Sequence, residues 1–433
     1  MRRQIGLLLA PVLLVTGGLT ACADSPAGRV TVIASWPEER LPDGSMSPDT
    51  EAAAFTAVLD VFAEETGIEV DYQGTRDVSQ VLRSGVERGS PPEVAVLPRL
   101  NDLQTYVRGR KLYPLDDVLD PGGRTDLAPQ LVTLGGRTYG LSVNVIPKSL
   151  VWYARDRQPA LARRPPATWE ELVDVSADLS TPWCLGMGAP PLSGWPGTDW
   201  IEDLLLHRWG PQLYREWTAG RLAWDSPQMR AVWQAWSEVT RAGRSTPNAL
   251  LTTFNVAGLD MFADKPVCHL DHQGSYIVRD YRRRAPDRFD FFPFPPFADR
   301  AGTGPTTEIA EDVVGMFDDT PQARALIRFL SGERARRTWR DASGGMAFTL
   351  NAGTRPADHP DGVSRRIADT LRRGTLCRDA SDLMPAAMTA AFHRAVLRYL
   401  DEPEALGALL SELDTVRGRI PNEEWLDLPC LTR

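Results

Sequence analysis

This chain has fewer basic than acidic residues. Its 433 residues include 48 lysines and arginines against 57 aspartates and glutamates, which gives a net charge of −9. Nucleic-acid backbones select basic surfaces, so this balance argues against a nucleic-acid partner. The basic clusters at Arg282-Arg283-Arg284 and from Arg334 to Arg340 lie among acids or on a helical pattern, which is typical of solvated faces.

The sequence also lacks the motifs of common hydrolases and metal sites. It contains no G-x-S-x-G, no H-E-x-x-H and no C-x-x-C. In a strand, His269 and Asp271 would share one face and His272 would take the other, so these three side chains would not converge on one ion. We therefore expect no metal, no cofactor and no enzymatic activity. A glycoside hydrolase that uses Asp199 and Glu202 is an alternative, but one helical turn would place both carboxylates on the same side of a sugar.

Long apolar runs are missing beyond Cys22, so no later segment is expected to span a bilayer. Before it, Arg2 and Arg3 precede an apolar run from Ile5 to Val15, and Leu19-Thr20-Ala21-Cys22 resembles the bacterial lipobox. The resemblance implies cleavage before Cys22 and lipid on its thiol and new amino group. We expect a lipoprotein signal peptide at 1–21, a lipid-anchored linker at 22–28, and a location on the extracytoplasmic face of the cell membrane. The alternative is a buried N-terminal helix.

Cysteines are few: besides Cys22 there are Cys184, Cys268, Cys377 and Cys430. An even number in an exported protein favours disulfides, and four cysteines allow three pairings. The order of the cysteines along the chain suggests two disulfide bonds, each joining neighbouring cysteines within one lobe of the protein. We therefore expect the pairs Cys184–Cys268 and Cys377–Cys430. Free buried thiols are the alternative.

What is present is a regular alternation of strand and helix patterns. Apolar strand patterns at 29–34, 68–72 and 94–97 are separated by amphipathic helix patterns, and Gly67 ends the first of these. A β-α-β unit implies parallel strands joined by a right-handed crossover. The alternation predicts an open α/β sheet, with ligands at the carboxyl ends of its strands. Gly135-Gly136 is predicted to form a hairpin turn.

The composition changes after Val145, because ten of the thirteen tryptophans lie between Trp152 and Trp236. Thr168-Trp169-Glu170-Glu171 is a capping box, and Ser226-Pro227 opens another helix. We expect a first lobe at 29–145 to which 303–352 return, and a second lobe at 148–300 with a helical tail at 355–433. The crossings between the lobes are expected near Val143–Lys148 and Pro296–Thr306.

Several segments in chain order resemble the extracytoplasmic solute-binding proteins of carbohydrate ABC importers. They are Phe62-Ala63-Glu64-Glu65-Thr66-Gly67-Ile68-Glu69-Val70, Arg88-Gly89-Ser90-Pro91-Pro92-Glu93-Val94-Ala95, Tyr139-Gly140-Leu141, Ser149-Leu150-Val151-Trp152-Tyr153 and Pro166-Ala167-Thr168-Trp169-Glu170-Glu171-Leu172. Pro182-Trp183-Cys184, followed by the run from Gly194 to Asp203, resembles the α-glucoside-binding type in particular. The resemblance implies a two-lobed, periplasmic-binding-protein-like α/β fold (type II). Each lobe would be a mostly parallel sheet flanked by helices, with a hinge between the lobes.

The resemblance also implies a function. We expect a monomer that captures a carbohydrate outside the membrane and delivers it to membrane permease subunits by lobe closure. A solute-sensing lipoprotein without a transport role is a second alternative beside the hydrolase.

A sugar offers hydroxyls at its rim and C–H groups on its faces, so a site for it needs carboxylates and flat aromatic rings. The candidate ligand-binding residues are Trp36, Glu51, Trp195, Asp199, Trp200, Trp224, His272, Trp339 and Gly345. Trp36 follows the first strand, and Glu51 opens the helix after it. Trp195, Asp199 and Trp200 share one Gly/Pro-rich segment, and Gly344-Gly345 resembles the family's turn near the cleft. For each candidate a structural role, in the core or at a helix N-terminus, is the alternative.

Overall fold

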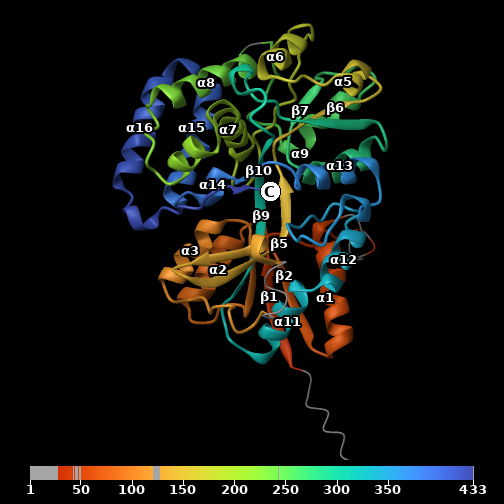
Figure 1. Cartoon of the computed structure of the whole chain (residues 1–433), viewed down its shortest axis with the longest axis vertical. Coiled ribbons are helices and arrows are strands. Elements are labelled where there is room, and N and C mark those ends of the chain that lie inside the picture. Colours follow the sequence, from red (N-terminus) through yellow and green to blue (C-terminus); the bar gives the residue numbers. More distant parts are fainter. Residues whose placement is uncertain are drawn as a thin grey trace, which may run out of the picture.

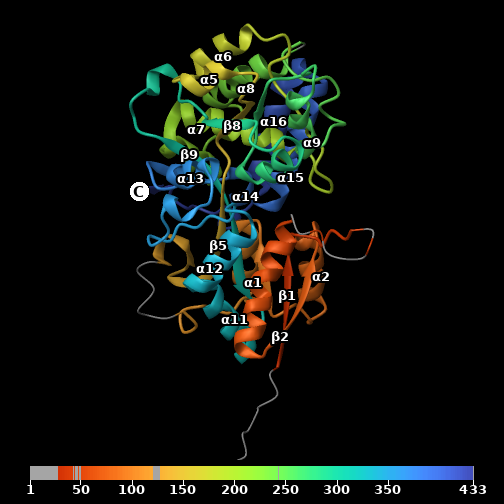
Figure 2. The same cartoon turned by 90° about the vertical axis from the view of Figure 1, so that its right-hand side faces the viewer.

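The computed structural model of the chain describes residues 28–432, except for 42, 44–46, 48–49, 120–126 and 242. The predicted signal peptide and the predicted lipidation site Cys22 lie outside the described residues. In the part that is described, no helix is both long and apolar enough to cross a membrane. The chain forms two lobes stacked one above the other (Figures 1 and 2).

The first lobe holds the N-terminal β-α-β units and a segment that returns to it after residue 305. Its elements are β1 (Arg29–Ala34), α1 (Glu51–Thr66), β2 (Glu69–Gly74), α2 (Val78–Glu87), β3 (Val94–Leu97), α3 (Leu100–Arg108), η1 (Ala128–Gln130), β4 (Leu131–Leu134), β5 (Arg137–Pro147), β9 (Thr306–Met316), α11 (Pro321–Ser331) and α12 (Glu333–Ala342). β1 pairs in parallel with both β2 and β3, as the alternation predicted. Phe55, Phe62 and Leu326 cover one face of this sheet, and Leu82 and Leu103 cover the other.

The second lobe is richer in helices. Its elements are β6 (Leu150–Ala154), α5 (Pro159–Arg163), α6 (Trp169–Ala177), α7 (Trp195–Thr218), α8 (Pro227–Thr240), α9 (Phe254–Ala257), η2 (Gly258–Phe262), β7 (Leu270–His272), η3 (Ser275–Ile277), α10 (Val278–Arg284), β8 (Phe289–Pro293) and η4 (Ala298–Arg300). The tail adds η5 (Pro356–Asp358), α13 (Gly362–Thr370), β10 (Thr375–Arg378), α14 (Ala380–Leu383), α15 (Ala386–Asp401), η6 (Pro403–Ala405), α16 (Leu406–Arg419), η7 (Asn422–Glu424) and β11 (Leu431–Thr432). α15 packs against α7 and α16, so the tail completes the core of this lobe.

The sheet of the second lobe differs from the expected parallel arrangement. Its order is β7-β6-β8, and β6 is antiparallel to both neighbours. The apolar run from Leu150 to Ala154 marks β6 as a buried central strand, but such a run does not encode the direction of the neighbouring strands. The two-lobed α/β fold is as expected, whereas the mostly parallel sheets are not: this sheet is antiparallel, and the sheet of the first lobe is mixed, because β9 is antiparallel to both β3 and β5.

Two long strands connect the lobes. β5 and β9 run side by side through the waist of the molecule and are antiparallel (Figure 1). β9 pairs with β10 through Thr306–Ile309 and with β3 through Val313–Met316. The second crossing is therefore β9 itself, not the expected segment at 296–306, because the pairing with β5 begins beyond that segment.

Local signals place the helix ends. The Thr50 hydroxyl accepts from the backbone N–H of Ala53 and so caps α1, and Gly67 ends that helix at φ 70°. Thr168 and Ser226 cap α6 and α8 in the same way. Gly135 and Gly136 have φ values of 57° and 82°, the positive pair that a tight hairpin between β4 and β5 requires.

The structure joins Cys184 to Cys268 and Cys377 to Cys430, the pairing expected from the chain order. The first disulfide ties the strand-like segment before α7 to the segment before β7. The second joins β10 to the segment before β11, so it bonds the last described residues to the long sheet that contains β9.

Candidate functional site

A cleft lies between the lobes at the level of the crossing strands. It consists of two adjoining pockets with volumes of about 430 Å³ and 260 Å³. The residues that line both pockets are Trp36, Thr50, Glu51, Ile146, Tyr276 and Arg279. These residues come from the first lobe, from β5 and from the second lobe, so the two pockets form one interlobe cleft.

The wall from the first lobe is aromatic. Trp36 follows β1, and its ring centroid lies 5.4 Å from that of Trp339 and 5.2 Å from that of Phe55. Trp36 retains 8% of its surface exposed, so it offers part of its ring to the cleft while the rest packs on α1 and α12. Its position agrees with the rule that ligands bind beyond the carboxyl ends of the strands of an open sheet.

The wall from the second lobe is also aromatic. Trp195, the first residue of α7, lies 4.8 Å from Phe254 and 5.7 Å from Tyr276, measured between ring centroids. All three side chains line the smaller pocket. The cleft therefore has flat apolar surfaces on both sides, which suit the C–H faces of a polyhydroxylated ligand.

The crossing strands β5 and β9 place two polar side chains, Asn144 and Asp312, at the floor of the cleft. The Asn144 side chain on β5 donates a hydrogen bond to Asp312 Oδ2 on β9 at 2.9 Å. Burial raises the pKa of Asp312 to about 7, although the hydrogen bond from Asn144 lowers it. A carboxyl group with this pKa takes either protonation state near neutral pH and can accept from or donate to a hydroxyl.

Glu51 and Arg279 add charge at the mouth of the cleft. Glu51 Oε2 lies 3.5 Å from Arg279 Nη1, and both residues line both pockets. Partial burial raises the pKa of the Glu51 carboxyl, whereas Arg279 and Arg76 lower it. Carboxylate and guanidinium groups thus stand where they can bond ligand hydroxyls.

Other sequence candidates lie in the core of the second lobe. Trp200 is 1% exposed and packs against Trp183 and His272, with ring centroids 4.7 Å and 4.4 Å away. His272 Nε2 lies 2.7 Å from Asp203 Oδ2. Trp224 packs against Trp217 and Phe392. The structure does not bring Trp200, His272 or Trp224 to the interlobe cleft.

Gly345 is buried beside the cleft, next to Gly344, which lines the larger pocket. It forms the turn after α12 at φ 87°, and its carbonyl accepts a hydrogen bond from His359 Nδ1. A Cβ at this position would lie 2.4 Å from Pro360 Cδ, so glycine suits both the backbone conformation and the close packing.

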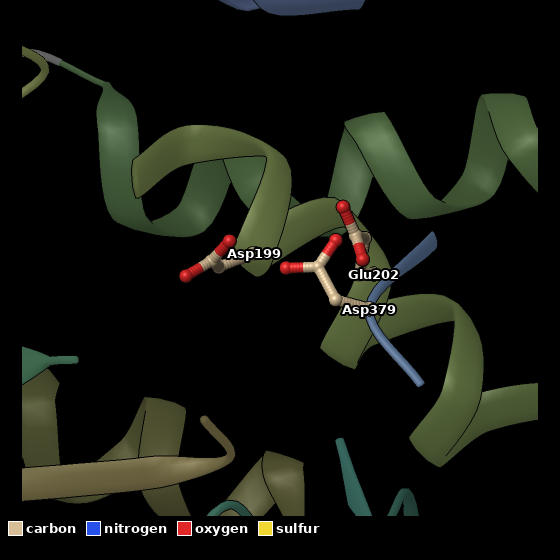
Figure 3. A group of neighbouring side chains, drawn as sticks. All are labelled: Asp199, Glu202 and Asp379. Carbon is tan, nitrogen blue, oxygen red and sulfur yellow. The ribbon is translucent and has the colours of Figure 1, made fainter. Parts of the chain in front are cut away.

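Asp199 lies directly behind the wall of the second lobe. Lys148 Nζ donates to Asp199 Oδ1 at 2.9 Å and to Asp379 Oδ2 at 2.6 Å. Glu202 joins this buried group, in which the three acids present carboxylate oxygens within 4.8 Å of one another (Figure 3). The oxygens could hold a metal ion by their spacing, but the Lys148 ammonium already bonds two of the three acids.

Sequence reasoning missed Asn144, Asp312, Tyr276 and Arg279. Tyr276 and Arg279 lie beyond β7, and the rule that pointed to Trp36 does not extend to them, because the sheet of the second lobe is antiparallel. Asn144 and Asp312 face each other in the register of β5 and β9, a pairing that neither strand reveals alone.

The fold and this cleft define a class: two-lobed binding proteins that enclose a ligand between lobes joined by crossing strands. The chain matches the bacterial extracellular solute-binding protein family over residues 47–337. It is 32% identical over 360 residues to the osmoprotective compounds-binding protein GgtB of Synechocystis sp., covering 78% of this chain and 83% of that one. The chain therefore belongs to the bacterial extracellular solute-binding proteins.

A further relative and a solved structure are also similar to this chain. The alpha-glucosides-binding periplasmic protein AglE of Rhizobium meliloti is 28% identical over 362 residues, covering 78% of both chains. The solved structure of the bacterial solute receptor AcbH, described with an exclusive preference for β-D-galactopyranose, matches with a TM-score of 0.75 at 17% identity. That match covers 90% of this chain and 98% of AcbH, and it shows that the two share a fold.

Proposed function

We propose that this protein captures a carbohydrate between its lobes outside the cell membrane and delivers it to the permease of an ABC importer. The cleft carries the proposal: Trp36 and Trp339 on one wall and Trp195 and Tyr276 on the other enclose the carboxyl groups of Glu51 and Asp312. Rings on both walls fit the faces of a sugar, and the polar groups between them fit its hydroxyls.

Among the relatives, AglE supports a carbohydrate ligand. AglE is named for alpha-glucosides and GgtB for osmoprotective compounds, and the AcbH structure is described with a galactopyranose preference. The ligand holds the lobes together because it touches both walls only when the cleft is closed, so it binds the closed form more tightly than the open form. The closed form then presents both lobes to the permease.

The finer parts of the proposal concern the N-terminus and the assembly. A lipid on Cys22 tethers the protein to the outer face of the cell membrane, and the protein acts as a monomer. The supporting observation is the sequence of residues 2–22, with its basic start, apolar run and lipobox-like end.

A thermal-shift screen tests the function. The protein is heated with monosaccharides, α-linked disaccharides, longer maltooligosaccharides and, as a solute without a sugar ring, glycine betaine. A ligand at a hundredfold excess over its Kd adds about 2.7 kcal/mol to the free energy of unfolding, which is a clear rise in Tm. We expect that rise with at least one saccharide and none with glycine betaine. A shift with glycine betaine alone, or turnover of a saccharide, would overturn the proposal.

A further inference from the structure

We propose that Lys148 is a positioning residue for the ligand: its ammonium holds the ring of Trp195 in place at the cleft, and Asp199 and Asp379 hold the ammonium. This role rests on the proposed function, because it gives the Trp195 ring a ligand to meet. Lys148 itself is buried and does not line the cleft.

The contacts of the ammonium carry the inference. Lys148 Nζ donates to Asp199 Oδ1 and Asp379 Oδ2, and it lies over the Trp195 ring, 5.0 Å from the centroid. A cation within about 6 Å of an indole face is attracted by the ring, and more strongly where water is excluded. The ammonium thus bonds two carboxylates and faces the ring on which the ligand is proposed to rest.

The start of α7 brings the ring and the carboxylate to the same ammonium. Trp195 and Asp199 are four residues apart on this helix, so they lie on one face. Trp195 is only partly buried and lines the cleft, whereas Asp199 is buried behind it. Lys148 therefore acts on the ring from the side that faces away from the ligand.

Asp379 is itself fixed. Its Oδ1 accepts from Ser381 Oγ at 2.7 Å and from the backbone N–H of Asp382 at 3.1 Å, which caps α14. Burial alone would raise the pKa of Asp379, but Lys148, the Ser381 hydroxyl and the backbone N–H of Asp382 together hold it below its ordinary value. The ammonium thus has one ionised and well-anchored partner.

The other two acids drawn in Figure 3, Asp199 and Glu202, have raised pKa values. Burial raises the pKa of Asp199 to about 6 even though Lys148 lowers it. Burial, then Asp379 and Asp199, raise the pKa of Glu202 well above its ordinary value, although Lys148 and the backbone N–H of Ala380 lower it. Lys148 thus bonds Asp379 and Asp199, and the backbone N–H of Ala380 bonds Glu202.

Lys148 is also bonded to the two strands, β5 and β9, that connect the lobes. It directly follows β5, and its backbone N–H donates to the carbonyl of Glu308 on β9 at 2.8 Å. The neighbouring Ser149 hydroxyl accepts from the backbone N–H of Glu308 at 2.7 Å. The position of the Trp195 ring is thus set relative to both crossing strands.

A double-mutant cycle tests this role. Lys148→Met alone would leave two buried carboxylates without their cation. Asp379→Asn is therefore added to remove one of them, and Asp199, with a pKa of about 6 even beside Lys148, can take up a proton once the ammonium is gone. Lys148→Arg serves as the charge-conserving control. With the saccharide found in the thermal screen, we expect the Lys148→Met/Asp379→Asn protein to bind about tenfold more weakly. In a Trp195→Ala background the same pair of changes should alter Kd less than twofold. An equal loss in both backgrounds, or no loss in either, would refute the positioning role.

A ligand-free measurement separates this inference from the proposed function. Protein labelled with 5-fluorotryptophan is studied by ¹⁹F NMR, with the Trp195 signal assigned from Trp195→Phe. We expect the Trp195 signal to shift or broaden in Lys148→Met/Asp379→Asn and to change less in Lys148→Arg. An unchanged signal contradicts the inference even if saccharides bind, and a changed signal supports it even if none does. If adding Mg²⁺ or Ca²⁺ to the wild-type protein moves the signal, the acids bind a metal ion and the role assigned to Lys148 is wrong.

Discussion

Glu51 and Arg279 face each other across the interlobe cleft, with Glu51 Oε2 3.5 Å from Arg279 Nη1. Glu51 begins α1 in the first lobe, and Arg279 lies on α10 in the second. The two side chains are 45% and 24% exposed, so their attraction contributes at most about 1 kcal/mol. The ion pair therefore costs little to break, and both side chains can exchange it for hydrogen bonds to a ligand.

We expect Glu51→Gln to weaken saccharide binding about tenfold or more with little change in Tm. A hydrogen bond from a hydroxyl to a charged group contributes about 1.5–3 kcal/mol, whereas the partly exposed ion pair contributes little to folding. Isothermal titration calorimetry measures the first quantity and thermal unfolding the second. Glu69→Gln, an exposed change on β2 outside the cleft, is the control. Equal affinity of wild type and Glu51→Gln would show that Glu51 does not contact the ligand.

Trp200→Ala should destabilise the protein rather than act on the ligand directly. The side chain is buried among Trp183, His272 and Phe294, and replacing a buried aromatic residue by alanine costs about 3–5 kcal/mol. Urea unfolding gives this loss, and Trp195→Ala, at the cleft wall, should mainly reduce affinity. A Trp200→Ala protein that keeps its unfolding free energy but loses the ligand would place this ring in the site.

Asp312 should make stability depend on pH. Its folded-state pKa of about 7 lies above the ordinary value of 3.8, so the folded protein keeps a proton that the unfolded chain releases. Its contribution to stability is full below about pH 4, falls as the pH rises to about 7, and is constant above that. Relative to Asp312→Asn, the wild type should lose Tm between about pH 4.5 and 7. Parallel Tm profiles of the two proteins would contradict the raised pKa.

Removing the disulfide between Cys184 and Cys268 should lower the free energy of unfolding by about 4 kcal/mol. The bond closes a loop with a sequence separation of 84, and constraint of the unfolded chain grows with loop length. The double variant Cys184→Ser/Cys268→Ser is compared with the wild type by urea unfolding. Peptide mapping without reductant checks the pairing, and a peptide joining Cys184 to Cys377 or Cys430 would disprove it.

Cys22→Ala should release the protein from membranes into the soluble fraction. The proposed lipid on this thiol is the anchor, and no described helix can span a bilayer. Fractionation of cells followed by detection of the protein measures the change. A Cys22→Ala protein that stays on the membrane would show that another anchor holds it.

Several features of the fold could be predicted from nearby residues. Thr50 and Gly67 delimit α1, and Gly135-Gly136 turns β4 into β5, because capping bonds and positive φ values involve only a few successive residues. Trp36 was predicted to follow the first strand because the β-α-β alternation identified that strand's carboxyl end. The direction of β7 and β8 was not predictable, because an apolar strand pattern is the same for either direction.

The sequence by itself determined the α/β alternation, the helix ends and an aromatic second lobe, since periodicity and capping are short-range. Only the tertiary structure decided which aromatic rings meet the cleft: Trp195 does, whereas Trp200, five residues later on the same helix, turns into the core. It likewise decided that Lys148 meets Asp379, 231 residues away in the chain. Such choices depend on how distant segments pack together, and no local pattern carries that information.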